Sequence, residues 1–173
     1  MEWLEYCTTE FRKMKGLADR AVAVLSDEQL RLALDPESNS VAVIMQHLAG
    51  NLRSRWSDFL TTDGEKPDRH RDQEFMEAQS GRKELLARWE EGWQILFSTL
   101  ASLKPEDLGR TVLIRSEPHT VPQAILRQVA HYGYHVGQIV LLAKHHAGDR
   151  WQPLSIPRGQ SDRFNAEMQR PHG

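Results

Sequence analysis

The chain has 173 residues and a formal net charge of −2, with 22 basic and 24 acidic side chains. This balance excludes the basic face expected of a nucleic-acid-binding protein, and no apolar stretch approaches the roughly 18 residues needed to cross a bilayer. The N-terminus has no basic region followed by an apolar run, so we expect no signal peptide and a cytoplasmic location. The single cysteine, Cys7, excludes an internal disulfide.

The first predicted element is a long amphipathic helix at the N-terminus. Its apolar side chains recur in steps of three and four residues, which is the spacing of one buried helix face: Leu4, Cys7, Phe11, Met14, Ala18, Ala21 and Leu25. Because Cys7 lies on this face, we interpret it as a small core residue rather than a reactive thiol. Ser26 and Gln29 then match a capping box that opens a short helix through Leu34, which Pro36 closes.

A second long helix is predicted from Ser40, which can cap its N-terminus, to about Leu60. Its apolar face consists of Val41, Ile44, Leu48, Leu52, Trp56 and Phe59. His47 lies at the flank of this face rather than at its centre. The polar segment from residue 61 to 79 predicts a surface loop with one helical turn around Phe75.

A third long helix is predicted from Ser80 to Leu103. Its apolar face consists of Leu86, Trp89, Trp93, Leu96, Leu100 and Leu103. A short β-branched run follows at Thr111, but Pro118 and Pro122 confine any strand pairing to a small hairpin.

The fourth long helix is predicted from about Pro122 to His146. Thr120 and Gln123 match a capping box at its start, and Gly148 is a suitable residue for its C-terminal end. Its apolar face consists of Ile125, Val129, Tyr132, Val136, Ile139 and Ala143.

Four long amphipathic helices joined by short or irregular connections predict an all-α fold, a four-helix bundle with a small hairpin before the last long helix. The length suits a single domain over residues 1–173. The tail over residues 151–173 is expected to pack on the bundle or to be partly irregular, with one helix from Ser161 to Gln169.

The main functional signal is a pair of histidines, His131 and His135, on the fourth predicted helix. Side chains four residues apart project from the same side of a helix, so both imidazoles can reach one ion. They flank the apolar face, as His47 does on the second helix, and metal sites in helix bundles are built from inward positions on facing helices. Three histidines would leave positions open for water or substrate, which suits a catalytic metal. The alternative is that they are partly buried side chains that bind no metal.

Two well-known metal sites are excluded by the sequence. No glutamate lies between His131 and His135 to act as the base of a zinc peptidase. The predicted helices also lack the Glu-x-x-His pairs of di-iron bundles. Spacing alone therefore suggests a metal without assigning a reaction.

Two glycines interrupt the same helix. Gly133 and Gly137 each weaken it by roughly 1 kcal/mol relative to alanine. Close helix packing is the favoured explanation, and room for a ligand beside the histidines is the alternative.

The order of the elements and two short motifs resemble the DinB superfamily of DinB/YfiT-like metalloenzymes. The motifs are Gln46-His47-Leu48-Ala49-Gly50-Asn51 and His131-Tyr132-Gly133-Tyr134-His135-Val136-Gly137-Gln138-Ile139. The tail, residues 154–161 with Phe164 and Asn165, resembles an uncharacterised bacterial branch of that superfamily. The resemblance implies a divalent ion, zinc or nickel, held by His47, His131 and His135 at the mouth of the bundle. It also implies a homodimer formed through helix packing.

The better-studied members are thiol-dependent transferases and isomerases that use mycothiol, bacillithiol or glutathione. We therefore expect a metal-dependent enzyme that transfers a low-molecular-weight thiol to a small electrophile, with the thiol supplied by a small cofactor. A metal-dependent hydrolase, in which the same ion activates water, is an alternative. A non-catalytic metal- or ligand-binding dimer that acts in stress response, and a purely structural bundle with coincidental histidines, are further alternatives. Apart from the three histidines, no catalytic or substrate-binding residue is assigned.

Overall fold

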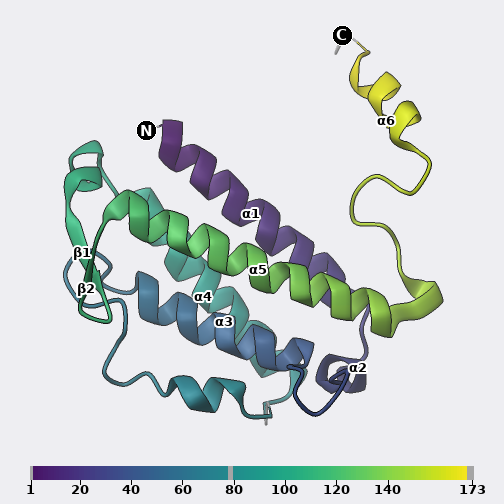
Figure 1. The fold of residues 1–173 in the computed structure, drawn as a ribbon, viewed down its shortest axis with the longest axis horizontal. Helices are drawn as coiled ribbons and strands as arrows, with labels where there is room; N and C mark the ends of the chain where they lie inside the picture. The colour runs from purple at the N-terminus through teal and green to yellow at the C-terminus, as the bar shows by residue number, and fades with distance from the viewer. Residues whose placement is uncertain (1, 78–79, 171–173) are drawn as a thin grey trace.

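The computed structural model describes residues 2–77 and 80–170, and helices dominate its regular structure (Figure 1). The four long helices are α1 (Glu2–Ala23), α3 (Val41–Trp56), α4 (Arg82–Ser102) and α5 (Val121–Ala147). The shorter ones are α2 (Asp27–Arg31), α6 (Ser161–Met168) and the 3-10 helices η1 (Arg71–Phe75), η2 (Pro105–Gly109) and η3 (Gly148–Arg150). Strands β1 (Thr111–Ile114) and β2 (Glu117–Thr120) form an antiparallel hairpin just before α5. The predicted all-α class with a small hairpin is confirmed.

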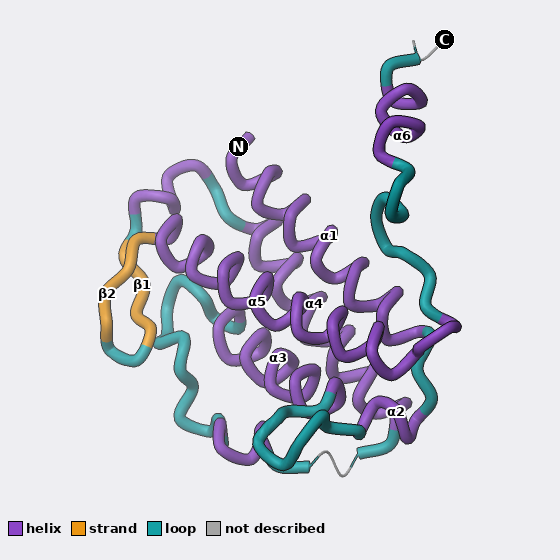
Figure 2. The backbone as a smooth tube through the Cα atoms, turned by 45° about the vertical axis from the view of Figure 1, so that its right-hand side comes forward, coloured by secondary structure: helices purple, strands orange, loops and turns teal. Residues whose placement is uncertain are grey.

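The long helices lie side by side, with α1 beside α5 and α3 beside α4 (Figures 1 and 2). Their apolar faces meet around four aromatic rings, one from each long helix: Phe11, Trp56, Trp93 and Tyr132. The Phe11 ring lies 5.7–6.4 Å, centroid to centroid, from the other three. Burial of side chains of this size stabilises the fold by roughly 1.5–3 kcal/mol each. This aromatic cluster therefore holds all four long helices together.

The helix starts follow from the capping residues that the sequence predicted. Ser26 and Thr120 both form capping boxes, in which the side chain accepts a backbone N–H and the partner glutamine returns a hydrogen bond. The Ser40 side chain accepts the backbone N–H of Val43 at the start of α3. These contacts satisfy backbone donors that the first turn of a helix leaves free.

Two predicted helix ends were wrong. The short helix ends at Arg31 rather than Leu34, and the second long helix ends at Trp56 rather than Leu60. In both cases the next residue has extended backbone, with ψ of 122° and 130°. The apolar pattern continues past the second end because Phe59 still packs into the core from a turn.

Helices α3 and α4 pack tightly against each other at a glycine. A Cβ on Gly92 would lie 3.0 Å from the Cβ of Leu52 and 3.4 Å from the carbonyl oxygen of Ala49. Near the start of α4, Leu85 is buried, whereas Leu86, which was expected in the core, is only partly buried.

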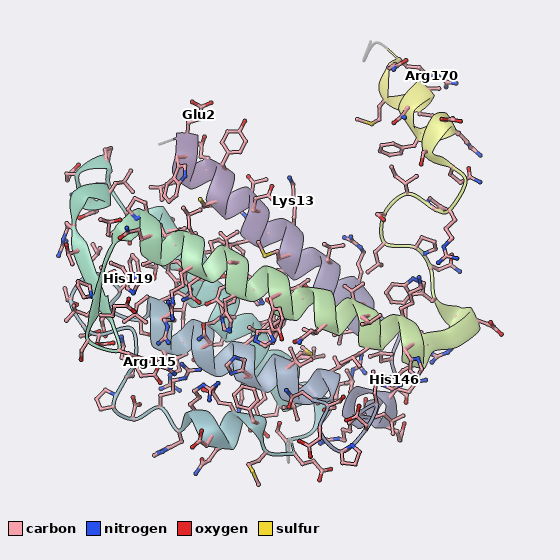
Figure 3. All side chains as sticks on the ribbon, in the orientation of Figure 1. Glu2, Lys13, Arg115, His119, His146 and Arg170 are labelled. Atoms are coloured by element: carbon pink, nitrogen blue, oxygen red, sulfur yellow. The ribbon has the colours of Figure 1, made fainter. Side chains whose placement is uncertain are left out.

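The C-terminal tail packs on the helices only in its first part. Trp151 and Leu154 contact the core, but α6 has no buried residue and extends away from the long helices, as the position of Arg170 shows (Figure 3). The last three residues of the predicted tail, 171–173, lie outside the described residues. Among the described helices, none has the length and apolar character required to span a membrane.

Candidate metal centre

Three histidines from two helices lie together between α3 and α5. His47 comes from the middle of α3, and His131 and His135 come from successive turns of α5. One nitrogen of each lies within 4.8 Å of the corresponding nitrogens of the other two, and the Nε2 atoms of His47 and His131 are 3.3 Å apart. These are the three residues that the sequence singled out, and they are placed so that they can bind one metal ion.

Burial of Tyr132 sets the rotation of α5 that brings two of the imidazoles inward. Its hydroxyl accepts a hydrogen bond from Trp56 Nε1 and donates one to Asn51 Oδ1, each 3.0 Å long. Both partners belong to α3, so this side chain fixes one face of α5 against that helix. His131, just before Tyr132, and His135, three residues after it, then point toward the flank where His47 lies.

Hydrogen bonds on the far side of two rings determine which nitrogen is free. Nδ1 of His47 donates to Glu74 Oε2 at 2.9 Å, and Nδ1 of His135 donates to Gln138 Oε1 at 2.8 Å. With Nδ1 engaged as a donor in each ring, Nε2 is the nitrogen left available to coordinate a metal.

The surroundings also favour neutral imidazoles. Burial, with the positive charges of His135, His47, Arg55 and Arg69 after it, lowers the pKa of His131 to about 3. Burial likewise lowers the pKa of His135, in spite of its hydrogen bond to Gln138. Metal ligation requires neutral imidazole, so these two side chains are in the required state at neutral pH.

Glu74 lies directly behind His47 and was not predicted. The expected helical turn near Phe75 is present as η1, but this segment is more than a surface loop, because Glu74 is only 9% exposed. Burial alone would raise the pKa of its carboxyl group, but hydrogen bonds from His47 and Arg69 and the charge of Arg69 together lower it. Arg69 forms two contacts with this carboxylate, of 2.7 and 2.8 Å. The carboxylate is therefore charged and held against the imidazole.

The Glu74 side chain reaches His47 across a glycine on α3. A Cβ on Gly50 would lie only 2.7 Å from the Glu74 Cδ, which is closer than real Cβ contacts come. Gly50, part of the first motif, is therefore the residue that lets this carboxylate approach the helix.

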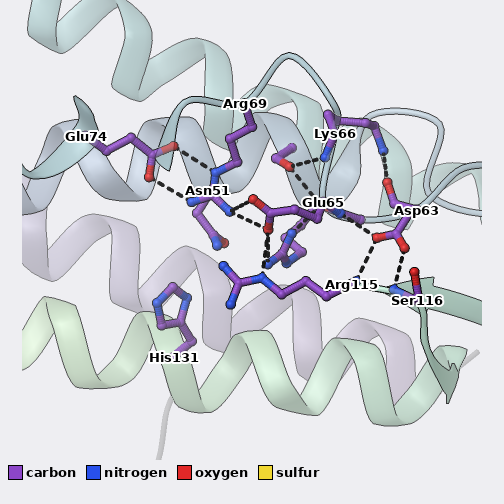
Figure 4. Close-up of polar contacts among 12 residues, drawn as sticks. Asn51, Asp63, Glu65, Lys66, Arg69, Glu74, Arg115, Ser116 and His131 are labelled. Carbon is purple, nitrogen blue, oxygen red and sulfur yellow. Dashed lines mark hydrogen bonds and ion pairs between the residues drawn. The ribbon is translucent and has the colours of Figure 1, made fainter. Parts of the chain in front are cut away.

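A network of charged side chains continues from Glu74 toward the hairpin (Figure 4). The Glu65 carboxylate accepts hydrogen bonds from Arg55 at 2.9 Å, Arg69 at 3.1 Å and Arg115 at 3.2 Å. Arg55 also donates to the carbonyl oxygen of Gly64. The loop after α3 is thus tied both to the histidine site and to the hairpin.

The other described histidines lie elsewhere. His119 is on β2, near one end of α5, and His146 is near the opposite end (Figure 3). His146 contacts the carbonyl oxygen of Leu32 at 3.0 Å rather than a metal site. Among residues 2–77 and 80–170, His47, His131 and His135 form the one group of three or more residues with metal-ligand geometry.

Neither explanation offered for the two glycines of α5 fits the described chain. Both are exposed; a Cβ on Gly137 would meet nothing within 4 Å, and one on Gly133 would meet only Met14 Sδ at 4.0 Å. They are therefore neither packed within the chain nor part of a ligand cavity beside the histidines.

These features define a mostly helical protein with a three-histidine candidate metal centre and a buried carboxylate behind one ligand. The chain belongs to the DUF1572 family, described as a protein of unknown function, whose model matches residues 1–160. The match includes all three histidines, Glu74 and the hairpin, and it stops just before α6. No curated protein shows significant similarity to the chain.

Proposed function

We propose that the protein is a four-helix bundle of the DinB type that holds a divalent ion, zinc or nickel, on His47, His131 and His135. The close approach of their nitrogens supports this, and so do the Nδ1 contacts that orient two of the rings. A carboxylate behind a ligating histidine is a common arrangement at zinc sites, because it fixes the ring and makes the ligand more basic. The donor set therefore fits such an ion.

We further propose that the site belongs to an enzyme that transfers a low-molecular-weight thiol to a small electrophile. The observation that carries this proposal is the number of candidate ligands among the described residues, which is three, as in catalytic sites that keep one position open. A divalent ion bound there would favour the thiolate form of a thiol, which is the nucleophilic form. The sulfur forms a bond to the electrophilic carbon and the thiol proton passes to the product or leaving group, so no redox partner is required.

The thiol is expected to come from a small cofactor because the chain offers no suitable cysteine. Cys7 is buried on the core face of α1, and burial, with a smaller contribution from Glu10, raises the pKa of its thiol. A buried thiol of raised pKa is a poor nucleophile.

Metal analysis of the purified protein tests the first part of the proposal. We expect about one ion per chain, and loss of the ion in His131→Ala and His135→Ala. His145→Ala, which changes an exposed histidine near the end of α5, is the matched control and should retain the metal. Retention of the ion in both site variants would contradict the assigned ligands.

Turnover of mycothiol, bacillithiol or glutathione with a model electrophile such as chlorodinitrobenzene tests the second part. Activity should disappear in His131→Ala and persist in Cys7→Ala. Loss of activity in Cys7→Ala with the metal retained would move the nucleophile to that residue. Absence of turnover by metal-loaded protein would contradict the transferase and favour hydrolysis or a binding role.

We also propose a homodimer formed through the exposed face of α5. This face, here called the α5 outer face, consists of Leu126, Ala130, Gly133, Gly137 and Leu141. The two leucines are 53% and 65% exposed, and no Asp, Glu, Lys or Arg occurs from residue 128 to 143. An uncharged, exposed helix face with small residues at its centre suits close packing against the same face of a second copy.

A further inference from the structure

The hairpin, which the charged network joins to the histidine site, has a turn that is unfavourable for its residues. Arg115 and Ser116 connect the paired residues Ile114 and Glu117, and their φ angles are 55° and 62°. Two-residue hairpin turns with positive φ at both positions strongly favour asparagine and glycine. An arginine and a serine in this conformation are strained, and such strain persists only where the surroundings impose it.

Asp63 imposes this conformation from the loop after α3. Its carboxylate accepts the backbone N–H groups of Arg115 at 2.8 Å and Ser116 at 2.7 Å, as well as that of Glu65 at 2.7 Å. The Gly64 N–H also donates to the carbonyl oxygen of Leu113 at 2.8 Å. The turn is therefore clamped in place, and the side chain at position 115 is projected in a defined direction.

That direction leads toward the histidines. The Arg115 guanidinium points toward His131, while its Nε donates to Glu65 at 3.2 Å (Figure 4). Its two terminal nitrogens have no hydrogen-bond partner within the described part of the chain, and the side chain is 53% exposed. A guanidinium fixed through Nε presents both terminal N–H groups as a fork that matches a carboxylate or a phosphate.

The local charge also favours an anion. Three guanidinium groups, those of Arg55, Arg69 and Arg115, converge on the single Glu65 carboxylate. The charges of Arg55 and Arg69 already act on His131, whose pKa they help to lower. A divalent ion on the histidines would add to this positive potential.

We infer that Arg115 is a specificity-determining residue that binds an oxyanion, a carboxylate or a phosphate, on the molecule whose other end occupies the histidine site. The inference rests on the proposed function in assuming that a ligand binds at the three histidines, and it adds that this ligand is anionic. The strained turn, its clamp by Asp63 and the free end of the guanidinium all serve to place a positive group beside the site.

Binding of matched probe pairs to metal-loaded protein tests the inference without an activity assay. The thiol pair is 3-mercaptopropionate and 2-mercaptoethanol; the thiol-free pair is succinic monohydroxamate and acetohydroxamate, whose hydroxamate groups bind divalent metals. Titration calorimetry should show that the carboxylate-bearing member of each pair binds the wild-type protein about threefold to tenfold more tightly, the modest range expected for a half-exposed charge pair. Arg115→Gln should abolish this advantage and leave the affinity of the neutral probes unchanged.

Arg163→Gln is the matched control, because it removes one exposed arginine of α6, outside this network. This variant should retain the carboxylate preference. In the wild-type protein the preference should decrease at high salt, because salt screens the charge pair. Equal preference in the wild-type protein and Arg115→Gln would overturn the inference while leaving the proposed function intact. If neither thiol binds but the hydroxamates are distinguished through Arg115, the inference stands and the thiol part of the proposed function fails.

Discussion

Glu74 orients His47, so the strength of metal binding is expected to depend on this carboxylate. Glu74→Gln preserves the shape of the side chain but removes its charge and its ion pair with Arg69. We expect metal affinity to fall about 10- to 100-fold, the usual effect of losing an outer-shell partner. Chelator competition measures the change, with Glu84→Gln on the surface of α4 as control. Equal affinities for the two variants would contradict the role given to Glu74.

Gly50 provides a second test of the same contact without changing any charged group. In Gly50→Ala the new methyl group must displace the Glu74 carboxyl. We expect a loss of metal affinity similar to that of Glu74→Gln, and little further loss in the double variant, because both changes break one interaction. The same competition assay applies, and additive losses would show that the glycine acts through something other than Glu74.

His131 should make the metal-free protein sensitive to acid. Its pKa is about 3 in the folded protein and about 6.5 in an unfolded chain. Between these values only the unfolded chain binds the proton, so stability is complete above pH 6.5 and falls by about 1.4 kcal/mol per pH unit as the pH decreases toward 3. Urea unfolding of chelator-treated protein at pH 7 and pH 5 measures this slope. His131→Gln should have a shallower slope, and an unchanged slope would contradict the assignment.

Among the elements, the hairpin turn has a strained backbone, and relief of that strain should measurably increase the free energy of unfolding. Ser116 has a φ of 62°, which an L-residue adopts at a cost of about 1–2 kcal/mol and glycine adopts freely. Glycine also adds conformational entropy to the unfolded chain, which offsets part of the relieved strain. We therefore expect Ser116→Gly to stabilise the folded protein by about 0.5–1 kcal/mol.

Ser57→Gly is the matched control for this change, since Ser57 has an ordinary φ of −67° after α3 and should gain nothing from glycine. Urea or thermal unfolding compares the two variants. Destabilisation by Ser116→Gly would mean that its side chain, rather than the turn geometry, matters for folding.

The helices could be predicted from sequence because their signals are local. Steps of three and four residues identified the four long elements, and capping residues such as Ser26, Ser40 and Thr120 located three helix starts. The ends were less certain, since Phe59 continues the apolar pattern after the backbone has left the helix. Hydrophobic spacing reports which side chains are buried, and it does not require that they all lie on one helix.

At the scale of the whole molecule, the histidines were predictable but their surroundings were not. His131 and His135 share a helix face by spacing, and His47 occupies an equivalent flank position. Glu74 lies in the short 3-10 helix η1 and Arg115 in the hairpin turn, 27 and 68 residues from His47, and neither segment has a long periodic pattern that relates its side chains to those of α3. Gly50, within the first motif, was the available signal for Glu74. A glycine inside a helix, where its backbone freedom is not needed, suggests that another group packs closely against the helix there.

The proposed dimer leads to a prediction about the assembled protein. Gly137→Glu places a charge in the α5 outer face, where a Cβ meets nothing within the chain. In an interface with two-fold symmetry the change occurs on both copies, so the carboxylates would lose solvation and repel each other. We therefore expect light scattering at micromolar concentration to give a dimer mass for the wild-type protein and a monomer mass for the variant, with metal content unchanged.

Gly109→Glu is the matched control for the dimer prediction, because this exposed glycine of η2 also has an open Cβ position. It adds the same charge outside the α5 outer face, so the dimer should persist. Since glutamate is a better helix former than glycine by up to about 1 kcal/mol, the monomeric Gly137→Glu variant should remain folded, which separates loss of the interface from loss of the fold. A monomeric wild-type protein would refute the dimer, and a dimeric Gly137→Glu variant would place the interface on another surface.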